Sequence, residues 1–128
     1  MRLLGIDYGT KRVGIAVSDQ NAEYALPFST ISNSKRMIDE IVEIAKNNAI
    51  KEIVLGESKN YKGEANMILP ATLELKKSLE EKGFTVHLEP EFMTSAHVEK
   101  LQGKTETIDA SAAALILQSF LDKRKNSA

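Results

Sequence analysis

The feature that most constrains the fold of this chain is its amino-terminal stretch, MRLLGIDYGTKRVGIAVS. Two apolar runs, residues 3–6 and residues 13–17, flank a short turn with glycine and basic side chains, a pattern typical of a β-hairpin. The first run shows no polar alternation, so we expect a central strand that is covered on both faces. Asp7 ends this strand, and an ionised carboxylate there needs a partner, such as a metal ion or the side chain of Lys11 or Arg12.

A purely structural role for this turn stays open at this point. Asp and Gly both favour turns for local backbone reasons, so Asp7 and Gly9 could do no more than shape the hairpin. Short motifs of this kind are weak evidence by themselves, and the decision depends on the rest of the chain.

The composition predicts one ordinary globular domain over residues 1–128. The chain is 42% hydrophobic and 27% charged, which is enough apolar material for a core. Its formal net charge is -1, so a nucleic-acid partner has to bind at a local basic patch. Cysteine is absent, which excludes disulfides and thiolate zinc sites, and only His87 and His97 offer imidazole. Any metal is therefore expected to be Mg²⁺ or Mn²⁺, which prefer oxygen ligands.

No apolar segment approaches the roughly 20 residues that a membrane span needs. The amino terminus does not resemble a signal peptide either. We therefore expect a cytoplasmic protein with no membrane partner.

Hydrophobic periodicity divides the rest of the chain into strands and helices. In order it predicts a strand over 26–31, a helix over 38–45, a strand over 53–56, a polar loop over 57–63, a helix over 64–82, a strand over 85–88, a short helix over 94–101 and a last helix over 107–123. Pro27 places the first of these strands at a sheet edge, and Asn33 or Ser34 is the expected cap of the next helix. Helices between strands imply parallel crossovers. We therefore expect an α/β fold whose five-stranded mixed sheet has three antiparallel strands, then two parallel strands, with helices flanking the sheet.

Four carboxylates follow predicted strand ends or begin the last helix. Asp7 ends the first strand, Glu57 follows the fourth and Glu91 follows the fifth, while Asp109 lies in the first turn of the last helix. Because the carboxyl ends of parallel strands open onto one crevice, these acids are expected to converge there. Clustered carboxylates repel one another unless a cation is bound. Two Mg²⁺ ions about 4 Å apart would then clamp a phosphodiester for in-line attack by water.

Each of these acids also has a simpler explanation without function. The helix dipole favours Asp109 in a first helical turn. Glu91 could lie with Glu89 in a solvated loop, and Glu57 could be no more than a capping residue. Only their joint placement at strand ends makes the acids candidates for a site.

Residues 5–16, GIDYGTKRVGIA, closely resemble the opening signature of the YqgF (RuvX) family of RNase H-like nucleases. Three later segments resemble further motifs of the family and follow in the same order along the chain. They are a loop with glycine and asparagine over 56–63, an acidic segment over 91–95 and a closing alanine-rich helix over 108–117. The resemblance covers essentially the whole chain and implies a single RNase H-like domain.

Carried over residue by residue, the resemblance places the family's acidic triad on Asp7, Glu91 and Asp109. It implies a bacterial cytoplasmic nuclease, a hydrolase of phosphodiester bonds that uses a divalent metal. The roles that it implies are maturation of the 5′ end of precursor 16S rRNA, in ribosome biogenesis, or resolution of four-way Holliday junctions. RNA or branched DNA, with ribosomal precursor particles, would be the partners, and the choice between monomer and homodimer stays open.

The leading interpretation gives each candidate side chain a role. Asp7 would bridge two metal ions, Glu91 would ligate one and Asp109 the other, with Glu57 as an additional acid. Polar and cationic side chains near the same end of the sheet would hold the nucleic acid through its phosphates. These candidate substrate contacts are Lys11, Arg12, Lys59, Asn60, Lys62 and Thr94.

Two departures from the family pattern bear on activity. Glu57 and Ser58 stand where the family has Leu-Pro, and Pro90 and Phe92 flank Glu91 where the family has Asp and Arg. The missing arginine removes a bidentate partner for phosphate or carboxylate. A nucleic-acid-binding or ribosome-binding module that has lost catalysis is therefore an alternative. An actin-like ATPase is disfavoured, because that class needs two such domains facing each other across a nucleotide.

Overall fold

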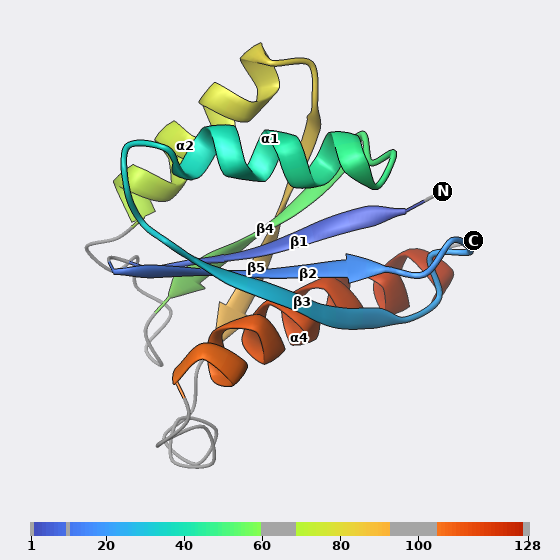
Figure 1. Ribbon diagram of the computed structural model, residues 1–128. Coiled ribbons are helices and arrows are strands. Elements are labelled where there is room, and N and C mark those ends of the chain that lie inside the picture. Colours follow the sequence, from blue (N-terminus) through green and yellow to red (C-terminus); the bar gives the residue numbers. More distant parts are fainter. Residues whose placement is uncertain (1, 10, 60–68, 93–104, 127–128) are drawn as a thin grey trace.

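The computed structural model describes residues 2–9, 11–59, 69–92 and 105–126, whose elements are arranged as Figure 1 shows. In chain order these elements are β1 (Leu3–Tyr8), β2 (Arg12–Ser18), β3 (Ala25–Ser32), α1 (Met37–Asn47), β4 (Glu52–Lys59), α2 (Leu69–Glu81), β5 (Thr85–Phe92) and α4 (Thr105–Asn126). The predicted order of three strands, then alternating helices and strands, is confirmed over these ranges. The predicted short helix over 94–101 lies outside the described residues.

The strands form one sheet in the order β3-β2-β1-β4-β5. β1 pairs antiparallel with β2, as β2 does with β3, whereas β4 pairs parallel with both β1 and β5. β1 is therefore the central strand, as its unbroken apolar run predicted, and β3, which holds Pro27, lies at an edge. The expected five-stranded mixed sheet is confirmed.

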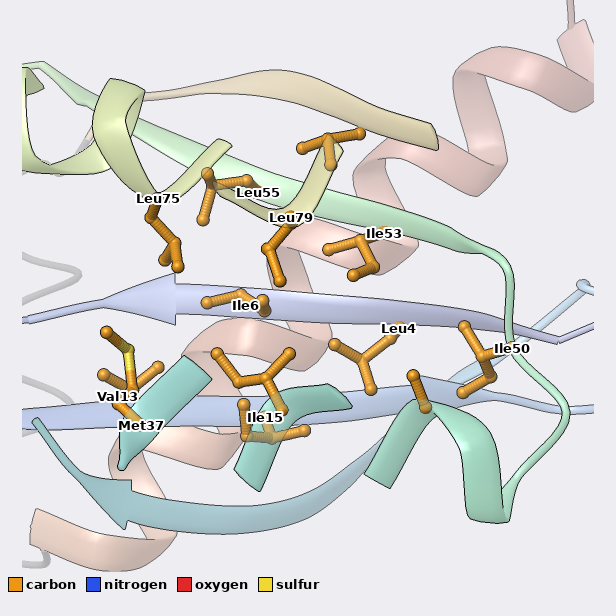
Figure 2. Close-up of a cluster of buried hydrophobic side chains, with 13 residues drawn as sticks. Leu4, Ile6, Val13, Ile15, Met37, Ile50, Ile53, Leu55, Leu75 and Leu79 are labelled. Atoms are coloured by element: carbon orange, nitrogen blue, oxygen red, sulfur yellow. The ribbon is translucent and has the colours of Figure 1, made fainter. Parts of the chain in front are cut away.

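Helices cover both faces of the sheet, with α1 and α2 on one face and α4 on the other (Figure 1). The core beneath α1 and α2 gathers Leu4 and Ile6 of β1 with Ile53 and Leu55 of β4 (Figure 2). Leu3, one position out of phase in β1, belongs instead to the cluster beneath α4. The alternation of β1 thus decides which of its side chains meet α4.

β4 and β5 both extend beyond their predicted ends. The sequence predicts a polar loop from Glu57, but β4 continues to Lys59, and β5 continues to Phe92 rather than ending at 88. The parallel ladder pairs Glu57 with Pro90 and Lys59 with Phe92. Each strand therefore provides the other with a pairing partner beyond its predicted end. Polar side chains do not end a strand whose backbone has a partner, and Pro90 is tolerated because β5 is an edge strand.

The start of α1 also differs from the prediction. Arg36 occupies the N-cap position and makes no side-chain capping hydrogen bond, so the predicted cap by Asn33 or Ser34 is wrong. Ser34 Oγ accepts a hydrogen bond from the backbone N–H of Arg36 (3.2 Å), one position before the helix. Across the described ranges, none of the helices combines the length and apolar character that a membrane crossing requires.

Candidate active site

Asp7 lies half-buried near the carboxyl end of β1, where it pairs across the ladder with Gly14 of β2. Leu3 packs beneath α4 and Gly5 lies against it, so the alternation of the strand places Asp7 on that same face. The predicted position of an acid at this strand end is confirmed. In Figure 1 the carboxyl ends of β1, β4 and β5 and the first residues of α4 lie toward the same side of the molecule.

Two glycines allow α4 to approach the sheet closely beside this strand end. A Cβ atom on Gly5 would lie 2.8 Å from Leu117 Cβ and 3.0 Å from the carbonyl oxygen of Ala113. A Cβ atom on Gly56 of β4 would lie 2.5 Å from Ile116 Cδ1. A larger residue at either position would therefore force α4 or its side chains to shift.

The contact between Gly5 and Ala113 fixes how α4 meets β1. From Gly5 to Asp7 the strand advances about 7 Å toward its carboxyl end. From Ala113 back to Asp109 the helix advances about 6 Å toward the same side, because it runs opposite to β1 (Figure 1). The backbone positions of Asp7 and Asp109 therefore lie toward the same edge of the molecule, about one helical turn beyond the glycine contact. We call this edge, formed by the carboxyl ends of β1, β4 and β5 and the first turns of α4, the rim.

The ladder between β4 and β5 sets the level of Glu91. Gly56 pairs with Glu89, and the β1–β4 register, continued by one residue, sets Asp7 level with Gly56. Glu91 lies two residues further along β5, so its Cα is about 10 Å across the sheet and about 7 Å along it from that of Asp7. Glu57 follows Gly56 directly, and the alternation of β4 assigns its position to the opposite face. The backbone thus places Asp7 and Glu91 at positions on the α4 face of the sheet, near the carboxyl ends of their strands, and places Glu57 at a position on the other face.

Several predicted site residues are described in part or not at all. Backbone alone is described for Glu57, Lys59, Glu91 and Asp109. Outside the described residues lie Asn60, Lys62, Thr94 and His97. Among the side chains that are described, no three Asp, Glu or His residues form a group that could hold a metal ion. The convergence of the acids therefore stays a prediction, which the backbone positions given above support.

Lys11 and Arg12 are exposed at the turn between β1 and β2, a few residues beyond Asp7. Asn33 holds this turn, because its side-chain amide donates a hydrogen bond to the carbonyl oxygen of Gly9 (2.8 Å) and its backbone N–H donates to that of Lys11 (3.0 Å). This role was not predicted, since Gly9 is 24 residues away along the chain. Asn33 therefore supports the part of the hairpin that carries the candidate phosphate contacts.

A second polar cluster on the α4 face lies at the other end of β4. Arg124 donates to both carboxylate oxygens of Glu52, at 3.2 and 3.3 Å, and His87 Nε2 lies 3.3 Å from Glu52 Oε1. The Arg124 guanidinium holds the pKa of Glu52 below its usual value of 4.5, against the opposing effect of partial burial and with further help from His87. His87 also packs on Phe120, with 4.8 Å between ring centroids. His87 is thus engaged away from the carboxyl ends of β1, β4 and β5.

Comparison with known families identifies the chain. The family model described as "RuvX: Holliday junction resolvase" matches residues 1–123 of this chain. The chain belongs to the RuvX family. A protein of Sulfurihydrogenibium sp. (strain YO3AOP1) is 34% identical over 131 residues, covering 95% of this chain and 90% of that protein. One from Endomicrobium trichonymphae is 36% identical over 136 residues, covering 94% and 95%. Both carry the name "Putative pre-16S rRNA nuclease".

Solved structures similar to this RuvX family member include two resolvases. Thermus thermophilus RuvC in complex with Holliday junction substrate has a TM-score of 0.61 at 15% identity, covering 98% of this chain and 96% of that one. The fowlpox virus Holliday junction resolvase has a TM-score of 0.58 at 12% identity, covering 96% and 99%. At such low identity the likeness shows the fold alone, and it confirms the predicted RNase H-like architecture.

The donor chemistry of this RuvX family member suits a hard cation. Asp7, Glu91 and Asp109 offer carboxylate oxygens, and the chain has no cysteine. His87, the described imidazole, is occupied with Glu52. Because Mg²⁺ and Mn²⁺ prefer oxygen ligands, the residues at the rim fit the expected metals.

Proposed function

We propose that this chain is a metal-dependent nuclease that hydrolyses phosphodiester bonds, with Asp7, Glu91 and Asp109 as its acidic site. The observation that carries the proposal is the shared rim formed by the ends of β1 and β5 and the first turns of α4, on one face of the sheet. Membership of the RuvX family and the nuclease names of its relatives support it.

Each acid has a role that suits its position. Asp7 from the central strand, Glu91 from β5 and Asp109 from α4 would together hold the metal through their carboxylate oxygens. When bound, Mg²⁺ or Mn²⁺ supplies charge stabilisation for the attacking and leaving oxygens of an in-line displacement. Lys11 and Arg12 would bind phosphates of the nucleic-acid backbone and orient the nucleic-acid strand across the rim.

We propose the 5′ end of precursor 16S rRNA as the substrate, because the names of the relatives point to that RNA. Precursor ribosomal particles in the bacterial cytoplasm would present it. Four-way DNA is the second candidate, favoured by the family description. Both substrates offer the same phosphodiester chemistry to the acids, so selection between them would depend on contacts further from the rim.

The test is cleavage of labelled precursor rRNA and four-way DNA, side by side, in Mg²⁺, in Mn²⁺ and in chelator. We expect cleavage of the RNA in either metal and none in chelator. Asp7→Asn should lower kcat at least about a hundredfold, the size of loss typical when a transition-state stabiliser is removed, and should leave binding intact.

Asp19→Asn is the matched control for this test. Asp19 also follows a strand of the sheet, but its carboxylate accepts hydrogen bonds from the backbone N–H groups of Glu23 (2.7 Å) and Tyr24 (3.0 Å), away from the rim. This variant should cleave as the wild type does. Binding without cleavage of either substrate under any metal would contradict the enzyme and support a binding module.

A further inference from the structure

Glu89 of β5 is a charged side chain buried between the sheet and α4. It is 4% exposed, and it is the one charged residue in the buried set of the described part of the chain. A solvated loop at this position, which the sequence allowed, is wrong because β5 continues through it and α4 covers it. A buried carboxylate is costly unless it is paired and hydrogen-bonded, so the partners of Glu89 matter.

Both partners of Glu89 come from α4. Ser119 Oγ donates a hydrogen bond to Glu89 Oε2 (2.9 Å), and Lys123 Nζ donates to the same oxygen (2.6 Å). These two residues are one helical turn apart and lie on one side of the helix. Together they fix both the position of α4 along β5 and its rotation about its own axis.

The elements that Glu89 joins are those that carry two of the three proposed catalytic acids. Glu91 lies two positions beyond Glu89 on the same strand, and Asp109 lies on α4. β5 is an edge strand, so its ladder with β4 restrains it on one side only. The contact with α4 through Glu89 supplies a restraint from a second direction, close to Glu91.

We propose that Glu89 is a positioning residue, which sets the distance between Glu91 and Asp109 by fastening β5 to α4 through Ser119 and Lys123. The inference rests on the proposed metal-dependent function. It assigns Glu89 no contact with metal or substrate, because its carboxylate is already shared between a hydroxyl and an ammonium group. Its effect on metal binding passes through the backbone of β5.

A matched ion pair exists elsewhere on α4. Glu52, near the amino end of β4, binds Arg124 with a two-point contact, so it also ties the sheet to α4. This pair lies at the opposite end of the strand from the acids. Glu52→Gln therefore removes a charge from a similar pair without disturbing the strand end that holds Glu91.

The experiment is isothermal titration of Mn²⁺ into the wild type, Glu89→Gln, Ser119→Ala and Glu52→Gln, with thermal unfolding of each. Loss of a residue that supports metal ligands typically weakens metal affinity about tenfold or more, and we expect that for Glu89→Gln. Ser119→Ala is the milder variant if Glu89→Gln folds poorly, and it should weaken affinity about threefold, as loss of one hydrogen bond of roughly 0.7 kcal/mol does. Glu52→Gln should lose stability but keep the wild-type affinity.

The outcomes separate this inference from the proposed function. If the wild type binds Mn²⁺ and both Glu89→Gln and Ser119→Ala bind it equally well, the positioning role is overturned while the metal site stands. The role is also overturned if Glu52→Gln weakens binding as much as they do, because the effect then follows general destabilisation. A wild type that binds no Mn²⁺ overturns the metal site and this inference with it.

Discussion

At the scale of single residues, the approach of α4 to the sheet depends on two missing Cβ atoms. A Cβ on Gly5 would meet Leu117 Cβ and the carbonyl oxygen of Ala113, which belong to the helix backbone or adjoin it and cannot rotate away. A Cβ on Gly56 would meet Ile116 Cδ1, the far end of a side chain that has other rotamers. The two glycines should therefore differ in how well they tolerate alanine.

Gly5→Ala is expected to lower the free energy of unfolding by about 2 to 3 kcal/mol, because α4 has to shift. Gly56→Ala should cost about 1 kcal/mol, since only the tip of Ile116 has to move. Adding Ile116→Val to Gly56→Ala removes Cδ1 and should recover part of that loss. Chemical denaturation followed by circular dichroism measures all three, and equal costs for the two alanine variants would contradict this account.

At the scale of elements, the turn between β1 and β2 is held by the residue that follows β3. Asn33 binds the turn at Gly9 through its side chain and at Lys11 through its backbone. The turn carries two candidate phosphate contacts and begins just after Asp7. Ordering this turn before substrate arrives reduces the entropy that binding would otherwise cost.

Asn33→Ala tests whether this support matters for binding. Loss of one hydrogen bond should cost about 1 kcal/mol of stability and, through a looser turn, weaken substrate binding about fivefold. Asn48→Ala is a close control, because the Asn48 side-chain amide also donates to a backbone carbonyl, that of Ile44, at 2.8 Å. Fluorescence anisotropy with labelled RNA should show weaker binding for Asn33→Ala alone. Equal binding by the two variants would leave Asn33 with a role in stability only.

At the scale of the whole molecule, the sequence predicts the layout of the sheet better than the extent of its strands. Local periodicity is enough to place β1 at the centre and to order the strands and helices that follow. The ends of β4 and β5 depend on their pairing with each other, which is a non-local contact. Polar composition over 57–59 and 89–92 therefore predicts loops where the structure has strands.

The candidate site divides in the same way. Asp7 is predictable as a site candidate because an ionised carboxylate at the end of a buried strand is costly to desolvate unless a partner compensates its charge. Asn33 and Glu89 are not, because their partners lie far away in the chain, 24 residues for Gly9 and 30 for Ser119. The sequence Glu89-Pro90 is typical of a loop. Only the structure shows that β5 continues through it and that α4, from the other end of the chain, covers Glu89. Residues that support a site are thus harder to find from sequence than residues that form it.

The charge of the whole molecule leads to the last prediction. A net charge of -1 gives little long-range attraction to nucleic acid, so binding would depend on the few cations near the rim. The candidate contacts that the sequence predicts are Lys11, Arg12, Lys59 and Lys62, of which Lys62 lies outside the described residues. Counterion release gives about −0.7 per phosphate contact for single strands and about −0.9 for duplex, so four contacts predict a slope of log K against log salt between about −3 and −4.

Binding of labelled RNA to the Asp7→Asn protein, measured from about 50 to about 200 mM salt, checks this slope. Adding Lys11→Ala should reduce its magnitude by about 1, because one phosphate contact is lost. Lys46→Ala, in the last turn of α1, removes an exposed lysine that is not a candidate contact and should leave the slope unchanged. A slope steeper than about −6 would require more contacts than the rim offers and would place the interface elsewhere on the molecule.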